Sequence, residues 1–519
     1  MKHRYWLPLL ASLAMVFFAN NVGITQSSLI DLEDSTGNAF QGWTSTPWLQ
    51  TDQADFDAGV LNNVDTSSSP GDVKLAVESN WYNTNWQYRR AITIDHTKVQ
   101  DVVNPSATYA NFPVLVYATG LSNIKANGAD IRFTSSNGIA ELPREIESYS
   151  GGTLYAWVKV TLTNDAGDSS NDIIYMYYGN SVATEPAPNS TYGSQNVWDS
   201  NYKGVWHLKD LTTSTVKDST SNNKDGTKTG AGEPALTTNG KISDAQVFDG
   251  SNDKIVTLLA DTLGDFTVEA WFRDTGVKTM YERIVDKSYT GGFWIGRNST
   301  TANSWGGGVR ETTSPLGRFV TLTDGQWHQI VSKRAGTTHY IIGDGGAVST
   351  TGTVTNAALD STVVRIGVDA AGSSFAYFSG VIDEVRISNI ARSADWIRTC
   401  YNNQNSPSTF CNLGGEVGLY VSSGTIASQV LDCGISGTRW DAIFWNRTLP
   451  AGTGITLEVR AGDVSFAKDG PSPSWISIGG ISPVTSGLPS GRYEQWRATL
   501  TTADTSLTPV LHEVLVYHN

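Results

Sequence analysis

Along most of the chain, hydrophobic and polar residues alternate with a period of two, which predicts β-strands with one buried face. The first series of such segments comprises residues 91–94, 113–117, 130–134, 154–160 and 173–178. Val, Ile, Tyr and Trp are frequent within the segments, and Gly, Asn and Ser separate them. Because the first group favours strands and the second favours turns, this series predicts a β-sandwich.

Two further series follow the proline-containing segment 186–189. The second extends to residue 392, and its near-continuous apolar runs at 266–272 and 381–387 are typical of a sandwich interior. The third occupies the last hundred residues. One short helix is predicted at residues 391–398, with Ser393 as its N-cap. The sequence therefore predicts an all-β fold with several β-sandwich (jelly-roll) domains in tandem.

The N-terminus predicts export. Lys2 and Arg4 precede an apolar run over residues 5–19, which has the length of a secretion signal and is short for a membrane-spanning helix. Residues 1–22 are a signal peptide or, because Phe17 is bulky for the −3 position of a cleavage site after Ala19, an uncleaved N-terminal anchor. We expect a secreted or cell-surface protein that meets a membrane only through this segment, if at all.

The amino-acid composition limits the kinds of molecule that the protein is expected to bind. The 36 Lys and Arg residues against 50 Asp and Glu give a net charge of −14, which argues against nucleic acid. Only 17% of the residues are charged, whereas 17 Trp, 20 Tyr and 16 Phe supply large apolar side chains. This composition is typical of an extracellular β-rich protein.

The first strand series resembles a known family. Residues 86–94, 129–133, 141–147 and 174–180 carry the motifs of the DUF2341 family, whose function is unknown. The resemblance implies a surface β-sandwich over residues 81–190. It does not imply any particular reaction or ligand.

The second series is similar to the laminin-G-like, concanavalin A-like lectin/glucanase superfamily. Residues 266–272, 325–328 and 380–387, followed by Ala391-Arg392, carry the similarity. It implies a two-sheet jelly roll over residues 198–400. Members bind glycans or proteins, and some hold calcium at the sandwich rim, so the fold alone does not define the function.

The third series, residues 413–519, is similar to β-modules of large bacterial and archaeal surface proteins. In such modules a stretch like residues 55–76 lies directly before the strand that corresponds to residues 425–431. Residues 23–80 are expected to be largely linker, with one strand at 72–76 that joins the C-terminal module. Our hypothesis is that the two middle domains are inserted into one split module.

The acidic residues do not predict an enzyme. Hydrolases of the glucanase type place Glu-x-Asp-x-Glu or a similar motif on one strand, and residues 200–395 contain none. Glu269 has no acidic partner two residues away, and Asp383 and Glu384 are adjacent, hence on opposite faces of a strand. Glu145 and Glu147 share a face if 144–148 is extended, where a solvated or salt-bridged edge is favoured over catalysis.

Exposed aromatic rings are the usual glycan-binding groups. Trp305 lies between Ser304 and a run of three glycines, a context that looks too flexible for core packing. We predict a ligand-binding group of Trp305, Trp294, Tyr281 and Arg310 at the rim of the jelly roll. The alternative is that Trp305 merely covers the end of the sandwich.

Calcium is the most reasonable ion, since it takes oxygen ligands from turns. Asp249, Asn252 and Asp253 share one turn, and Asp383 occupies a position where laminin-G-like domains often have a structural acid. We predict structural calcium at these four residues, with simple turn formation as the alternative.

Three cysteines are present. Cys400 and Cys411 flank a polar, turn-rich segment and are predicted to form a disulfide outside the cell. The alternative is that both are isolated buried thiols, with Cys433 as a third. The spacing of the three does not suggest a metal site.

These features predict an exported, non-catalytic surface protein that binds glycans or other cell-surface polymers in an adhesion or envelope role. One alternative is a glycoside hydrolase of the concanavalin A-like glucanase type. A second alternative is a structural spacer or assembly subunit.

Overall fold

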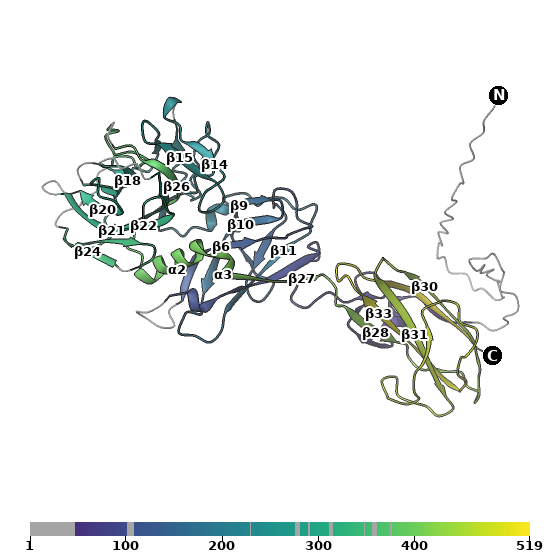
Figure 1. Ribbon diagram of the computed structural model, residues 1–519. Helices are drawn as coiled ribbons and strands as arrows, with labels where there is room; N and C mark the ends of the chain where they lie inside the picture. The colour runs from purple at the N-terminus through teal and green to yellow at the C-terminus, as the bar shows by residue number, and fades with distance from the viewer. Residues whose placement is uncertain are drawn as a thin grey trace, which may run out of the picture.

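The chain folds into three β-sandwiches, each inserted into the next, in a computed structural model (Figure 1). The structure describes residues 47–100, 108–228, 230–275, 281–288, 291–310, 315–346, 348–354, 361–373 and 376–518. The all-β class predicted from the alternating pattern is confirmed. The predicted signal peptide or anchor, residues 1–22, lies outside the described residues. Within the described part of the chain, no helix has the length and apolarity needed to cross a bilayer.

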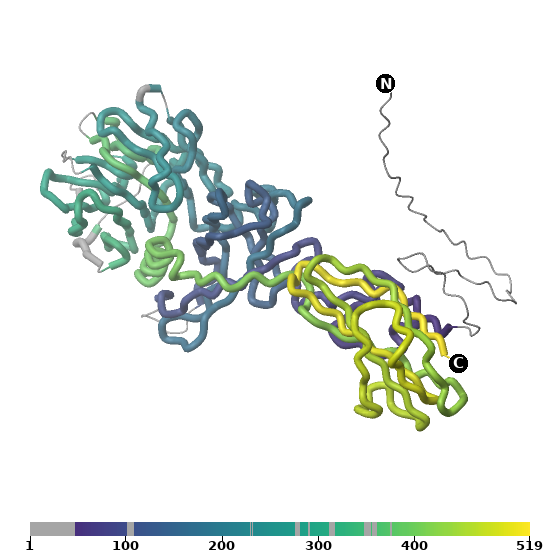
Figure 2. The backbone as a smooth tube through the Cα atoms, turned by 45° about the vertical axis from the view of Figure 1, so that its right-hand side comes forward, coloured from purple at the N-terminus to yellow at the C-terminus, as the bar shows by residue number. Residues whose placement is uncertain are grey.

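The outer sandwich is built from both ends of the described chain, which appear together in purple and yellow in Figure 2. Its first sheet has the order β1-β34-β30, formed by Trp48–Gln50, Val510–His518 and Trp440–Thr448. Its second sheet has the order β2-β28-β33-β31-β32, formed by Val60–Asn62, Ser423–Ala427, Tyr493–Thr502, Thr453–Gly462 and Ile476–Gly479. The short strand β29 (Leu431–Asp432) pairs with β33, and β3 (Val64–Asp65) pairs with β4 (Lys74–Leu75).

The N-terminal segment is structural rather than a linker from residue 48 onward. Strand β2 pairs with β28, and Val73 forms a bridge with Leu511. The helix α1 (Gln53–Asp57) is capped by Asp52 and buries Phe56 in the outer core. The other two sandwiches are thus inserted between residue 77 and residue 419.

The middle sandwich is also split. One sheet has the order β6-β10-β9, formed by Tyr109–Ala118, Thr153–Leu162 and Arg144–Ser150. The other has the order β27-β5-β11-β7-β8, formed by Cys411–Gly418, Tyr88–Ile94, Asp172–Tyr178, Arg132–Thr134 and Glu141–Leu142. In the sequence, strand β27 comes after the whole of the third sandwich, the inner one. The inner sandwich is therefore itself an insertion into the middle one.

The inner sandwich is a two-sheet jelly roll whose buried side chains form one core. One sheet has the order β14-β15-β26-β17-β22-β23-β24, with β12 paired to β26: Ala235–Thr237, Ala245–Asp249, Ser379–Ser388, Phe266–Asp274, His328–Ala335, Thr338–Gly343, Val348–Thr353 and Tyr202–Trp206. The other has the order β13-β16-β25-β18-β19-β20-β21: Gly226–Thr227, Ile255–Thr257, Arg365–Ile366, Arg283–Lys287, Phe293–Gly296, Ser304–Arg310 and Pro315–Thr321. Short 3-10 turns occur at His96–Lys98, Ser194–Asn196 and Gly230–Gly232.

The helix α2 (Ala394–Asn405) lies between the inner and middle sandwiches (Figure 1). It begins where predicted, because the Ser393 hydroxyl accepts the N–H of Trp396. Asn403 exchanges two hydrogen bonds with the backbone of Leu115 on β6, and Gln404 accepts the indole N–H of Trp271 from the inner sandwich. The second helix, α3 (Pro407–Phe410), leads into β27. Both helices therefore join the two sandwiches, and the predicted boundary at residue 400 falls inside α2.

The predicted disulfide is absent, because Cys400 and Cys411 are free buried thiols. Cys400 lies on α2, which continues past it to Asn405, whereas Cys411 opens β27 and lies against the carbonyl of Leu115. Burial raises the pKa of both thiols, that of Cys411 to about 12. The alternative of isolated core thiols describes them correctly.

Candidate functional site

The middle and inner sandwiches share a buried boundary. Leu115 and Trp157 from the middle sandwich pack against Trp198, Tyr202 and Val205 in one apolar cluster. All five side chains are almost fully buried. Burial on this scale holds the two sandwiches together as one unit.

A buried histidine lies at the centre of this boundary. His207 directly follows β12, and its Nδ1 lies 2.6 Å from Oε1 of Glu384 on β26. Two acids of β9 approach from the middle sandwich, Glu145 at 3.4 Å from Nε2 and Glu147 at 3.5 Å from Nδ1. These four residues form what we call the His207 cluster.

Indole and guanidinium groups surround the acids of the cluster. Trp157 donates its indole N–H to Glu147 at 2.5 Å, and Trp198 donates to Glu145 at 2.9 Å. Arg386 donates to Glu384 at 2.5 Å and lies over the ring of Trp157, 4.3 Å from its centroid. Such charge-assisted bonds allow ionised groups to be buried.

A bulge places Glu384 in the cluster. Its φ is +49°, and the pairing of β26 with β17 shifts register between the partners of Glu269 and Trp271. Positive φ at a non-glycine residue is strained and interrupts the alternation of a strand. As a result Asp383 and Glu384 are both fully buried, although they are adjacent in sequence.

The pKa values of the cluster diverge. Burial alone would lower the pKa of His207, but Glu384, Glu147 and Glu145 raise it well above its usual value. Burial favours a raised pKa for Glu145, yet the charge of His207 lowers it to about 2. Burial and the charge of Glu384 raise the pKa of Glu147 to about 7. A protonated His207, together with Arg386 at Glu384, thus offsets the negative charge buried in the cluster.

The raised pKa of Glu147 gives a testable pH effect. Between pH 4.5, the ordinary value, and about 7, folded Glu147 keeps a proton that the unfolded chain has lost, so this residue reduces stability as pH rises. We expect a Glu147→Gln protein to gain stability relative to the native protein over this range, as measured by urea unfolding at a series of pH values. Glu185→Gln, at a half-exposed partner of Arg144, is the control. A stability difference that does not change with pH would contradict the assignment.

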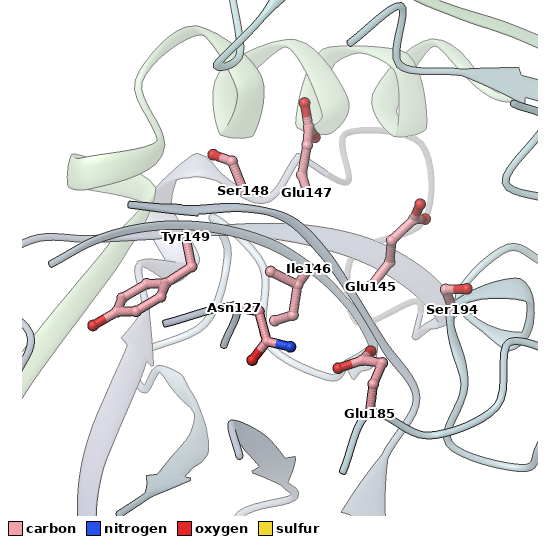
Figure 3. A pocket seen from close by; sticks show the side chains of 8 residues that line it. All are labelled: Asn127, Glu145, Ile146, Glu147, Ser148, Tyr149, Glu185 and Ser194. Atoms are coloured by element: carbon pink, nitrogen blue, oxygen red, sulfur yellow. The ribbon is translucent and has the colours of Figure 1, made fainter. Parts of the chain in front are cut away.

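A groove runs along the outside of the same boundary. Its first cavity, about 340 Å³, is lined by Asn127, Glu145, Ile146, Glu147, Ser148, Tyr149, Glu185 and Ser194 (Figure 3). A second, about 370 Å³, is lined by Ser148, Ser150, Thr153, Tyr155, Thr238, Asn239, Gly240, Lys241, Ser243 and Asp244. A third, about 310 Å³, is lined by Tyr117, Tyr155, Lys241, Gln404, Asn405, Ser406, Pro407, Ser408 and Thr409. Ser148 lines both the first and the second cavity, and Tyr155 and Lys241 line both the second and the third, so the three cavities adjoin one another along this boundary, and we call them together the groove.

Residues of both sandwiches form the walls of this groove. Strand β9 is the edge of its sheet, and Ser148 on it accepts a hydrogen bond from Ser243 across the groove at 2.9 Å. Tyr117 and Tyr155 are cross-strand partners on β6 and β10, with ring centroids 4.9 Å apart. Lys241 donates to Asn405 at 2.7 Å. The groove is therefore polar, with a pair of half-buried aromatic rings at one end.

The predicted rim site is wrong for three of its four residues. Trp305, Trp294 and Arg310 are at most 5% exposed, and only Tyr281 keeps an exposed ring. Trp305 packs on Phe272 within the inner core, and its indole N–H donates to Asp324. Arg310 binds the carboxylate of Asp286.

The glycines after Trp305 explain the error. They lie within β20, where a Cβ on Gly306 would come 2.1 Å from the carbonyl oxygen of Arg318, and one on Gly307 would come 2.5 Å from Ile341. The run of glycines therefore reflects close packing of a strand, not flexibility.

The predicted calcium ligands do not converge. Asp249 accepts the backbone N–H groups of Ser251 and Asn252, and Asp253 accepts that of Asp249, so hydrogen bonds within the turn use these acids. Asp383 accepts two backbone N–H groups elsewhere, at Lys241 and Ile242. Among the residues that the structure describes, no clustered set of acidic, histidine or cysteine ligands includes these aspartates. The alternative of turn formation accounts for Asp249, Asn252 and Asp253.

Sequence reasoning found part of the boundary site. Glu145 and Glu147 do share a face of β9, as predicted, but they are buried against His207 instead of forming a surface edge. His207 and Glu384 were missed, since they lie 177 residues apart and carry no shared local motif.

Comparisons with known proteins agree with the order of the domains. Residues 127–199 match DUF2341, a domain of unknown function, and residues 249–398 match the concanavalin A-like lectin/glucanases superfamily. The DUF2341 match lies largely in the middle sandwich and the concanavalin A-like match lies largely in the inner sandwich, in the order that the resemblance in the sequence predicted. No protein of curated function matches the chain.

Several solved structures match parts of the chain at low similarity. Domain 4 of AbnA, an extracellular GH43 arabinanase from Geobacillus stearothermophilus in complex with arabinotriose, is 19% identical at a TM-score of 0.29, over 39% of this chain and 98% of that one. The botulinum neurotoxin serotype D ligand-binding domain in complex with N-acetylneuraminic acid is 12% identical at 0.32, over 39% of this chain and 51% of that one. The CBM40 of the Ruminococcus gnavus IT-sialidase, bound to α2,3-sialyllactose, is 14% identical at 0.23, over 27% of this chain and 83% of that one. Similarities at such low TM-scores do not bear on the function of this chain.

Proposed function

We propose that this protein is a non-catalytic, exported surface protein that binds an extended glycan in the groove between its middle and inner sandwiches. The observation that carries the proposal is the adjacency of the three cavities along the boundary, which offers several neighbouring subsites for the sugars of one chain. The basic start and apolar run of the N-terminal sequence support the proposed export.

The chemistry of the groove suits sugars. Tyr117 and Tyr155 supply ring faces for the apolar side of a sugar, and Asn127, Asn239 and Asp244 supply amide and carboxylate groups for its hydroxyls. Hydroxyls from serine and threonine line the rest. Aromatic faces with a few polar groups are the usual means of glycan binding.

The state of the acids supports a binding role without hydrolysis. A glycosidase needs two carboxyl groups that reach the sugar bond. The side chain of Glu147 is 0% exposed and accepts the indole N–H of Trp157, while Glu145 accepts bonds from Trp198 and Ser219. In Figure 3 both carboxylates point to the same side of β9, whereas Ile146 points to the other. Hydrogen bonds at the boundary between the sandwiches therefore engage the carboxylates of both acids.

A glycan array followed by calorimetry tests this proposal. We expect the purified protein to bind an extended oligosaccharide, and Tyr155→Ala to weaken binding about tenfold, since lost ring stacking and buried area correspond to about 1.4 kcal/mol. The matched control is Tyr340→Ala, at a half-buried tyrosine of β23 that lines none of the three cavities.

Three outcomes would contradict the proposal. They are no binding to any glycan, unchanged affinity in the Tyr155→Ala protein, or release of reducing sugar from a bound polysaccharide that Glu147→Gln abolishes. Glycan binding should persist in the presence of a calcium chelator. The reason is that Asp249 and Asp253, which were predicted to bind calcium, accept hydrogen bonds within their own turn.

A further inference from the structure

Three side chains of different chemistry meet in the outer sandwich. Cys433 follows β29, Glu494 lies on β33, and His518 ends β34. One ligand atom from each, the thiol sulfur, a carboxylate oxygen and an imidazole nitrogen, all lie within 4.8 Å of one another. Cys433 and Glu494 come from one sheet and His518 comes from the other, so the group spans the sandwich at the end that carries the C-terminus (Figure 1).

The carboxylate of this group is buried without the donors that normally accompany such burial. Glu494 is 0% exposed, and no backbone, hydroxyl or indole donor reaches either of its oxygens, which leaves the Cys433 thiol as the hydrogen-bonding group beside it among the described residues. Nδ1 of His518 is also buried without a hydrogen-bond partner. An unsatisfied buried polar group destabilises the fold, so this arrangement points to a missing partner.

The His207 cluster provides a contrast within the same chain. There, Trp157, Trp198 and Arg386 donate to the buried acids, and the histidine supplies positive charge. Around Glu494 the described residues offer no such cation. A positively charged ligand would supply what the protein does not.

We propose that Cys433, Glu494 and His518 bind one Zn²⁺ ion, with water as the fourth ligand. Thiolate, imidazole and carboxylate are the three ligand types that zinc takes in proteins, and zinc sites are tetrahedral. Calcium and magnesium are disfavoured because they require oxygen ligands throughout. The ion crosslinks the two sheets of the outer sandwich, at the end remote from the middle sandwich.

Zinc binding at this site displaces protons. Burial raises the pKa of Glu494 to about 8, and a hydrogen bond from Cys433 opposes this shift. Burial and the nearby charge of Glu494 raise the pKa of the Cys433 thiol to about 12. Zinc affinity should rise with pH, with release of these protons on binding.

Metal loading of the full chain tests the proposal. We expect the chelator-treated protein to bind one equivalent of Zn²⁺ in equilibrium dialysis, and to unfold at a higher temperature when loaded. Co²⁺ in place of Zn²⁺ should give the intense near-ultraviolet absorption of a thiolate-to-cobalt bond. This band reports a sulfur ligand directly and does not depend on any variant. Failure to bind either metal, or a cobalt complex without the band, would overturn the proposal.

Variants then assign the ligands. Cys433→Ser and Glu494→Gln should each weaken Zn²⁺ binding by at least about tenfold and remove the thermal stabilisation. Both substitutions preserve size, and circular dichroism confirms folding. His512→Gln, at another histidine of β34 that bonds to Asp72, is the control and should bind zinc normally. Equal binding by the Cys433→Ser and native proteins would also overturn the proposal.

Discussion

Replacing His207 with alanine is expected to lower the free energy of unfolding of the middle and inner sandwiches by about 3–5 kcal/mol, the usual cost of removing one partner from a buried ion pair. The substitution leaves Glu145, Glu147 and Glu384 facing one another without the imidazolium between them. Arg386 still neutralises Glu384, but the two acids of β9 lose the imidazolium and keep only the weaker influence of Lys209. The boundary between the sandwiches should open, and the linker at residues 186–196 should become sensitive to protease.

The measurement is urea unfolding at pH 6, combined with limited proteolysis. His328→Ala is the control, since this histidine of the inner sandwich is more exposed and pairs with Asp344 near the surface. We expect the control to cost about 1 kcal/mol or less. A His207→Ala protein as stable as the control would show that the cluster does not hold the boundary together.

Replacing Trp305 with alanine is expected to destabilise the inner sandwich by about 3–5 kcal/mol, as for other large aromatic residues in cores. Its ring is 0% exposed, packs on Phe272 at a centroid distance of 4.3 Å, and carries the guanidinium of Arg297 at 3.9 Å. The change leaves a cavity and removes the indole donor to Asp324. Calorimetric melting of the native and variant proteins measures the effect.

Phe319→Ala is the matched control, because Phe319 lies on the adjacent strand β21 with an exposed ring. Its loss should cost less than about 1 kcal/mol. A Trp305→Ala protein that keeps its stability and loses glycan affinity would restore the rim site predicted from the sequence and remove the case for the groove.

Local pattern accounts for the strands and for the residues that pack within a single sheet. Glu145 and Glu147 share a face because side chains alternate along an extended strand, and this holds wherever the strand lies. The N-cap at Ser393 was readable for the same reason, since a capping hydroxyl acts within three residues. The same reasoning failed at Trp305, where glycines that allow close strand packing resemble a flexible loop.

The nesting of the domains depends on the pairing of strands that lie far apart in the sequence. Strand β27 completes the sheet of the middle sandwich through β5, although more than 300 residues separate them in the chain. Segment composition carries little information on such partners, because many exposed sheet edges could accept one more strand.

The sequence by itself determined that this protein consists of β-sandwiches, with a match to DUF2341 before a match to the concanavalin A-like superfamily, because alternation and family motifs are local properties of the chain. Only the tertiary structure decided which acids are buried around His207, where a groove opens, and that Cys433, Glu494 and His518 meet. The physical reason is that burial and the convergence of charges depend on which distant strands become neighbours.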